Sequence, residues 1–260
     1  KDKHYAYLSS ILKYKTISCL FYQPSTRTYS SFLSAAQKLG AGIVPLLGSE
    51  NLSVNKGETL EDTVRTLSFY ADCIVLRHPE VGAAERAASV SSVPIINAGD
   101  GTGEHPTQAL LDFYTIQSQL DITKTNTITF LGDLKHSRTV HSLVKLCSLF
   151  NFKFNFVSPE SLSLDAEMYG YLKDKDKYFD EYYKLDLCIR NTDVLYVTRI
   201  QKEYFKSNES YNLVKDSYVI NNESLRYAKP EMMIMHPFPR VNGISIEVDS
   251  DSRAFYFKQI

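Results

Sequence analysis

The sequence of 260 residues is 43% hydrophobic and 23% charged, with a formal net charge of −1 and an isoelectric point near 6.7. This composition is typical of a globular protein with room for two cores of about 100 to 150 residues each. The balanced charge argues against a nucleic-acid partner, and no apolar run approaches the roughly 20 residues of a membrane span. We therefore expect neither nucleic acid nor a membrane as a partner.

In the first half of the chain, strand-like apolar runs alternate with helical patterns. The predicted strands cover residues 16–22, 42–46, 73–76 and 94–97, and a long helical pattern covers residues 106–120. Such alternation is typical of a parallel sheet with helices on both faces.

The segment Ser25-Thr26-Arg27-Thr28 follows the first predicted strand and begins an amphipathic helix, which we expect to end at Gly40. The first turn of a helix presents unpaired N–H groups and a partial positive charge, and Arg27 adds a full one. Most such segments only cap a helix. Its place directly after a strand makes this one a candidate anion site.

The second half starts a new alternation after the polar stretch 121–126. Its predicted strands are 127–131, 153–157, 194–197 and 232–235, with a helix over 138–149. We place the domain boundary at the polar stretch, which gives domains 1–121 and 122–260. The fold class is then α/β, with two doubly wound parallel-sheet domains and the active site in the crevice between them. The charged run 174–184 is interpreted as a solvated face with Tyr and Phe packed beneath it.

Polar residues follow the predicted strands, at the end of a parallel sheet where ligands bind. They form the segments 77–79, 105–108, 198–201 and 236–240, each with a cation or an imidazole. Gly99, Gly101 and Gly103 precede the second segment. Their spacing does not fit a dinucleotide fingerprint, so we interpret them as a flexible loop and expect no nucleotide cofactor.

The cysteines and histidines do not suggest a metal site. Cys19, Cys73, Cys147 and Cys188 are isolated in sequence, which favours buried thiols in a reducing compartment. His136 and His141 are five residues apart, so a helix would not place both imidazoles on one face. These spacings lead us to expect neither a metal nor a cofactor. The first residues lack the apolar core of a signal peptide, so we expect a cytoplasmic protein.

Taken in order, seven motifs resemble those of the carbamoyltransferase family, in its aspartate-specific branch. They are PSTRT at 24–28, KGET at 56–59, RHP at 77–79, NAGDGTGEHPTQ at 97–108, GDLKHSRTVHSL at 132–143, TRIQKE at 198–203 and HPFPRV at 236–241. The last three favour an aspartate-specific over an ornithine-specific member. The resemblance covers nearly the whole chain.

The resemblance implies that the first domain binds carbamoyl phosphate and the second binds L-aspartate. The amine of aspartate then displaces phosphate, giving N-carbamoyl-L-aspartate for pyrimidine biosynthesis, without a covalent intermediate or a metal. It also implies a homotrimer in which the loop with Ser53 and Lys56 reaches the active site of a neighbouring subunit. A regulatory chain or a multienzyme partner is possible for such a family member.

The resemblance also assigns residues to roles. Those expected to act in catalysis are Arg27, Thr28, Arg77, His105 and Gln108. Carbamoyl phosphate is expected at Ser25, Thr26, Arg27, Thr28, Ser53, Lys56, Arg77, His105 and Gln108, and aspartate at Lys56, Arg138, Arg199, Gln201 and the backbone of Phe238. Guanidinium groups suit phosphate and carboxylate oxygens because their planar fork can donate two hydrogen bonds.

Two positions depart from the family pattern. Gln23 stands where the family usually has an acid, and Tyr204 stands where it often has Arg. The sequence also ends before the C-terminal helix found in relatives. A non-catalytic homologue acting as a scaffold or allosteric partner is therefore the alternative, although every expected catalytic residue is present.

Overall fold

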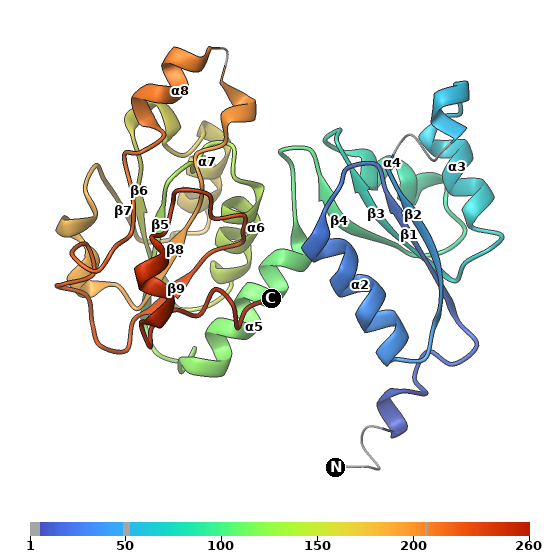
Figure 1. Cartoon of the computed structure of the whole chain (residues 1–260), viewed down its shortest axis with the longest axis horizontal. Helices are drawn as coiled ribbons and strands as arrows, with labels where there is room; N and C mark the ends of the chain where they lie inside the picture. Colours follow the sequence, from blue (N-terminus) through green and yellow to red (C-terminus); the bar gives the residue numbers. More distant parts are fainter. Residues whose placement is uncertain (1–5, 49–52, 206) are drawn as a thin grey trace. The chain divides into compact units, whose positions relative to one another are not determined.

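The structure is a computed structural model that describes residues 6–48, 53–205 and 207–260. It divides into two compact units, Lys1–Thr107 and Gln108–Ile260, each built on one parallel sheet with helices packed against it (Figure 1). The predicted α/β class is confirmed. The helix α5 (Pro106–Gln119) begins at the end of the first unit and continues into the second.

The first unit has a four-stranded sheet in the order β2-β1-β3-β4, with every pair parallel. Its strands are β1 (Thr16–Phe21), β2 (Gly42–Leu47), β3 (Cys73–His78) and β4 (Ile95–Asp100). Its helices are α2 (Thr26–Lys38), α3 (Leu60–Leu67) and α4 (Ala83–Val90). All four predicted strands are present, and β3 and β4 extend two or three residues beyond their predicted ends.

Both faces of this sheet are buried, which explains its nearly continuous apolar runs. Leu20, Ile74 and Leu76 pack against the helices α3 and α4 on one face. On the other face, Phe21 and its neighbours pack against Phe32 of α2. The helix α2 ends at Lys38 and Gly40 follows with a φ of 86°, as the sequence predicted.

The second unit has a five-stranded parallel sheet in the order β7-β6-β5-β8-β9. Its strands are β5 (Asn126–Leu131), β6 (Phe152–Val157), β7 (Phe179–Tyr182), β8 (Val194–Val197) and β9 (Met233–Met235). Its further helices are α6 (Arg138–Cys147), α7 (Ala166–Asp174) and α8 (Asn208–Val214). Short 3-10 helices occupy Ser53–Lys56 (η2) in the first unit and, in the second, Glu160–Leu162, Leu185–Leu187, Ile189–Asn191, Lys202–Tyr204 and Ile246–Ser250.

The strand β7 corrects the interpretation of the charged run 174–184 as only a solvated face. It pairs with β6, and Phe179 packs edge-on against Tyr169, with ring centroids 5.0 Å apart. The aromatic residues of this run do pack inward. Because β7 lies at the sheet edge, its acidic side chains reach solvent, which hides the strand pattern.

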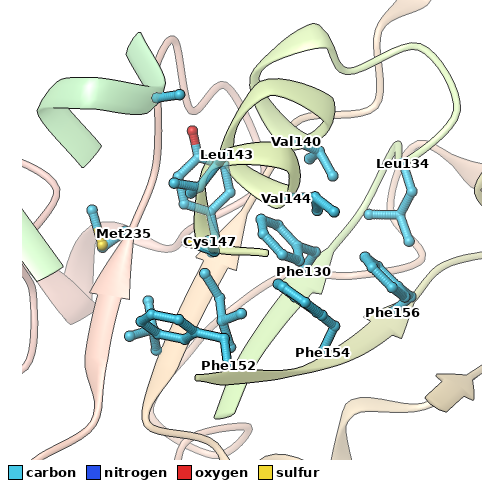
Figure 2. Close-up of a cluster of buried hydrophobic side chains, with 14 of the residues drawn as sticks. Phe130, Leu134, Val140, Leu143, Val144, Cys147, Phe152, Phe154, Phe156 and Met235 are labelled. Atoms are coloured by element: carbon cyan, nitrogen blue, oxygen red, sulfur yellow. The ribbon is translucent and has the colours of Figure 1, made fainter. Parts of the chain in front are cut away.

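The largest core of the second unit lies between its sheet and the helices α5, α6 and α7. Figure 2 shows Phe130, Phe154 and Phe156 on the strands beneath Val140 and Val144 of α6. The rings of Phe130 and Phe156 stack with centroids 5.7 Å apart. Burying one such side chain contributes about 2 to 3 kcal/mol. A second core, which includes Leu131 and Val197, covers the opposite face.

All four cysteines are free thiols. Cys19, Cys147 and Cys188 are buried and Cys73 is half-buried, so the predicted burial is confirmed for all but Cys73. Within the described residues, we find no helix with the length and apolar character that crossing a membrane requires.

Candidate active site

In the first unit, the chain changes direction between β1 and β3, which are neighbours in the sheet. It leaves β1 toward β2 on one side and leaves β3 toward β4 on the other. Ligands in open α/β sheets bind outside the carboxyl ends of the strands at such a switch point. Phe21 pairs with Arg77 there, so the segment after β1 and the guanidinium of Arg77 start from adjacent strand ends.

The first turn of α2 lies at this switch point. Ser25 is the N-cap, and its hydroxyl accepts a hydrogen bond from the backbone N–H of Thr28 at 3.3 Å. Arg27 is half-buried, and desolvation lowers the pKa of its guanidinium. An anion beside a partly desolvated cation and a helix N-terminus would be stabilised by both. Ser25 to Thr28 thus form the start of this helix, as the sequence predicted.

Arg77 lies near the end of β3, and His105 lies in the loop between β4 and α5. The Arg77 Nη1 donates to the carbonyl of Ala98 on β4 at 3.2 Å, which orients the guanidinium. His105 is buried just before α5, with its Nδ1 3.5 Å from the Thr107 hydroxyl. Both residues carry donors suited to an oxygen that gains negative charge.

The glycine-rich loop before His105 is held in place, contrary to the interpretation of it as flexible. Asp100 accepts hydrogen bonds from the backbone N–H groups of Gly82 and Glu104, both at 3.0 Å. Gly101 has a φ of 53°, and a Cβ there would lie 2.7 Å from the carbonyl oxygen of Pro79. This glycine therefore serves a close backbone approach that positions His105.

In the second unit, the switch point lies between β5 and β8. The loop after β5 carries Gly132, whose φ is 120° and whose added Cβ would lie 2.3 Å from the carbonyl oxygen of Thr198. Gln201 Nε2 donates to the carbonyl of His136 at 3.3 Å, which ties the two loops together. At position 132, only glycine allows the backbone to come this close to the carbonyl of Thr198.

The candidate aspartate residues of the second unit surround this switch point. Arg138 is the first residue of α6, and Arg199 lines a small solvent-open hollow of about 20 Å³ together with Lys215. Tyr204, one of the departures from the family pattern, stacks on His136 with ring centroids 5.0 Å apart. The two cationic side chains of the hollow, Arg199 and Lys215, are suited to an anionic ligand.

Phe238 lies in a turn that follows β9, the neighbour of β8. His236 is buried, and its Nδ1 accepts a hydrogen bond from the N–H of Phe238 at 2.8 Å. Phe238 has a φ of 53°, unusual for a bulky residue, and the Phe238–Pro239 peptide bond is cis. Arg240 forms an ion pair with Asp249, which fixes the position of its guanidinium.

A buried carboxylate, which the sequence interpretation missed, connects several of these residues. Asp112 on α5 accepts hydrogen bonds from Gln108 at 2.9 Å, Tyr196 at 2.7 Å and Gln259 at 2.7 Å. Burial raises the pKa of Asp112 to about 7. The signal was present, since Asp112 falls with Ala109, Phe113 and Ile116 on the apolar face of the helix at the spacing of 0, 3, 4 and 7.

The remaining predicted residues are less constrained. Ser53 and Lys56 share the short 3-10 helix η2, and Lys56 is exposed. His141, interpreted as structural, is buried and pairs with the carbonyl of Leu134 at 2.8 Å. In the part of the chain that the structure describes, no group of three or more His, Cys, Asp and Glu side chains could hold a metal ion.

Comparison with known proteins assigns both units. Residues 1–118 match the family model "Aspartate/ornithine carbamoyltransferase, carbamoyl-P binding domain", and residues 124–260 match "Aspartate/ornithine carbamoyltransferase, Asp/Orn binding domain". The chain belongs to the aspartate/ornithine carbamoyltransferase family. The resemblance inferred from the seven motifs is confirmed.

Curated members of this family differ in length. The chain is 51% identical over 252 residues to the multifunctional protein pyr1-3 of Dictyostelium discoideum. The matched region covers 97% of this chain but only 11% of that protein. It is 49% identical over 249 residues to the aspartate carbamoyltransferase catalytic subunit of Thermoplasma volcanium, covering 96% of this chain and 81% of that one. The chain therefore spans about a ninth of its multifunctional relative and most of the separate catalytic subunit.

Solved structures of the family share the fold. The catalytic subunit of aspartate transcarbamoylase from M. jannaschii is 48% identical, with a TM-score of 0.88 over 96% of this chain and 81% of that one. The Trypanosoma cruzi enzyme in complex with N-(phosphonacetyl)-L-aspartic acid is 42% identical, with a TM-score of 0.90 over 96% and 80%.

Proposed function

We propose that this chain is an aspartate carbamoyltransferase, which transfers the carbamoyl group of carbamoyl phosphate to the amine of L-aspartate. The products are N-carbamoyl-L-aspartate and phosphate, and the reaction belongs to pyrimidine biosynthesis. One observation carries the proposal: each unit has cationic and hydrogen-bond-donating groups at its own switch point, one set suited to a phosphate and the other to a dicarboxylate.

The phosphate group is assigned to the first unit. Ser25, Thr26, Arg27 and Thr28 would bind it at the start of α2, and Arg77 at the adjacent strand end would add a second guanidinium. Ser53 and Lys56 complete the proposed set for carbamoyl phosphate. Neutralising the phosphate oxygens stabilises the leaving group as its bond to the carbamoyl carbon breaks.

The carbamoyl carbon is attacked by the lone pair of the aspartate amine, which gives a tetrahedral centre with a negatively charged oxygen. Thr28, Arg77 and His105 would donate to that oxygen, and Gln108 would hold the carbamoyl NH₂. Collapse of the centre breaks the bond to phosphate, and the amine nitrogen loses a proton that a phosphate oxygen can accept. Positioning and electrostatics then suffice for catalysis without a covalent intermediate.

Aspartate is assigned to the second unit. Arg138, Arg199 and Gln201 at its switch point would bind the two carboxylates, with Lys56 as a further cation and the backbone of Phe238 facing the amine end. The open hollow beside Arg199 and the turn held by His236 support this assignment. A neutral acceptor side chain would leave one of these cations unpaired.

The assembly and location form part of the proposal. We propose a cytoplasmic homotrimer in which Ser53 and Lys56 serve the active site of a neighbouring subunit. A regulatory chain or a multienzyme context is compatible with relatives of both lengths. The four free thiols agree with a reducing compartment.

The test is to measure carbamoyl-aspartate formation by the full chain from carbamoyl phosphate and L-aspartate. Ornithine serves as the competing acceptor and Arg77→Ala as the inactive control. Turnover with aspartate alone, abolished by Arg77→Ala, is the expected result. A folded trimer without turnover would instead support the non-catalytic scaffold suggested by Gln23 and Tyr204.

A further inference from the structure

The buried carboxylate of Asp112 lies between two segments that the proposed function assigns to different substrates. One is Gln108, on the preceding turn of α5, and the other is the turn at His236 and Phe238. All these residues belong to the second unit. Figure 1 shows the C-terminus close to α5, which agrees with the hydrogen bond from Gln259 to Asp112.

The first connection concerns the orientation of an amide. Gln108 directs its Nε2 to the Asp112 Oδ1 at 2.9 Å. The Oδ1 of Asp112 accepts this hydrogen bond, so it selects the NH₂ end of the Gln108 side chain. The carbonyl end of that amide is then turned away from the carboxylate, in the orientation needed to accept from a carbamoyl NH₂.

The second connection runs through Gln259. Its Nε2 donates to the same Oδ1 at 2.7 Å, and its Oε1 accepts from the backbone N–H of His236 at 3.0 Å. The imidazole of His236 in turn accepts from the N–H of Phe238 at 2.8 Å. A chain of three hydrogen bonds therefore runs from Asp112 to the backbone of Phe238.

The third partner holds the carboxylate itself. Tyr196 on β8 donates to Oδ2 at 2.7 Å, so both oxygens of Asp112 have partners and the carboxylate cannot rotate without breaking a hydrogen bond. Asp112 and Tyr196 are fully buried. A carboxyl group in such a place is costly unless each oxygen is paired, which argues for a role beyond packing.

From this geometry we infer that Asp112 is a positioning residue for the carbamoyl transfer. It orients the amide of Gln108 directly and the turn at Phe238 through Gln259. The inference rests on the proposed function, because Gln108 and Phe238 take their roles from it. Asp112 thus holds in place both a residue proposed to bind the carbamoyl group, Gln108, and one proposed to bind aspartate, Phe238.

The experiment compares steady-state kinetics of the full chain with those of four variants: Asp112→Asn, Gln108→Ala, Gln259→Leu and the double variant Asp112→Asn/Gln108→Ala. Asn has one accepting oxygen and an NH₂ group that only donates, so it cannot accept from Gln108, Gln259 and Tyr196 together, and kcat is expected to fall roughly 10- to 100-fold. Gln259→Leu is expected to raise the KM for aspartate several-fold while the KM for carbamoyl phosphate changes less than about twofold.

The double variant separates positioning from a general loss of structure. If Asp112 acts through Gln108, Asp112→Asn should reduce kcat less than about threefold further in the Gln108→Ala background. The matched control is Thr192→Val, which disturbs another buried polar pair of the same unit, Thr129 and Thr192 at 2.6 Å. It should lower the melting temperature and leave the kinetic constants unchanged.

The outcomes are distinct. An inactive unsubstituted chain would refute the proposed function, and the inference with it. An active chain whose Asp112→Asn variant keeps its kcat, or whose two substitutions act independently, would overturn the inference alone. Should Asp112→Asn fail to fold, the double-variant comparison is made between Gln108→Ala and Gln259→Leu, whose effects must be non-additive if both depend on the same oxygen.

Discussion

In the first unit, the candidate residues Ser25 to Thr28 are consecutive and are held by the start of one helix. In the second unit, the candidate residues come from segments far apart in the chain, and side-chain hydrogen bonds join them. Gln201 bonds to a residue 65 positions away, and Gln259 bonds to one 147 positions away. A site made by local backbone geometry tolerates changes elsewhere, whereas a site held by distant side chains depends on each of them.

The largest expected effect comes from removing one guanidinium from each unit. Arg27→Ala should lower kcat/KM for carbamoyl phosphate about 10²- to 10³-fold, and Arg199→Ala should do the same for aspartate, because each leaves substrate charge uncompensated. Steady-state kinetics with each substrate varied in turn would measure both effects.

The control for these two variants is Arg86→Ala. Arg86 is exposed and pairs with Glu61 at 3.1 Å and Glu80 at 3.0 Å, so its removal should change neither kinetic constant more than about twofold. If Arg27→Ala and Arg199→Ala affected the same substrate, the division of roles between the units would be wrong.

The second effect concerns the close approach of two loops in the second unit. Gly132→Ala should lower the free energy of unfolding by about 3 kcal/mol, because the new Cβ would meet the carbonyl of Thr198 at 2.3 Å on a backbone with positive φ. Gly170→Ala is the matched control. It lies in α7 with no atom near the new methyl group, and it should raise stability by about 0.5 to 1 kcal/mol. Chemical denaturation of both variants would measure the difference.

The third effect is a pH dependence of stability from Asp112. Its pKa is raised from 3.8 to about 7 by burial, so between these values the folded chain keeps a proton that the unfolded chain has released. The contribution of Asp112 to the free energy of unfolding therefore falls as pH rises from about 4 to 7, by up to roughly 1.4 kcal/mol per unit. Asp112→Asn should remove this slope in denaturation curves recorded at several pH values.

Asp251 provides the comparison of opposite sign. Its hydrogen-bonded ion pair with Arg253 lowers the pKa of Asp251, so the stability it contributes is present above the unfolded pKa near 3.8 and is lost as pH falls below it. Asp251→Asn should thus weaken acid sensitivity below about pH 4 and leave the slope between pH 4 and 7 intact. The same slope change in both variants would contradict the assignment to Asp112.

The smallest effect is expected at Tyr204. Tyr204→Ala removes the ring stacked on His136, whose carbonyl accepts the hydrogen bond from Gln201. Such a stack contributes about 0.5 to 1.5 kcal/mol, so the KM for aspartate should rise roughly 2- to 10-fold. Tyr183→Ala, at an exposed residue of the same unit, should leave the KM unchanged.

The strands of both sheets other than β7 could be predicted from sequence, because parallel strands buried on both faces are short apolar runs that alternate with amphipathic helices. The strand β7 was missed, since acidic side chains at a sheet edge break the apolar run. The glycines before His105 were misinterpreted because glycine permits both mobility and close approach, and only the neighbouring carbonyl of Pro79 distinguishes the two.

The sequence by itself determined the α/β class, the family and the start of a helix at Ser25 to Thr28, because each depends on residues close together in the chain. Only the tertiary structure decided the strand order, the two switch points and the partners of Asp112. These depend on which distant segments become neighbours. The role of a buried carboxyl group such as Asp112 can be inferred only when the hydrogen-bond donors around it are known.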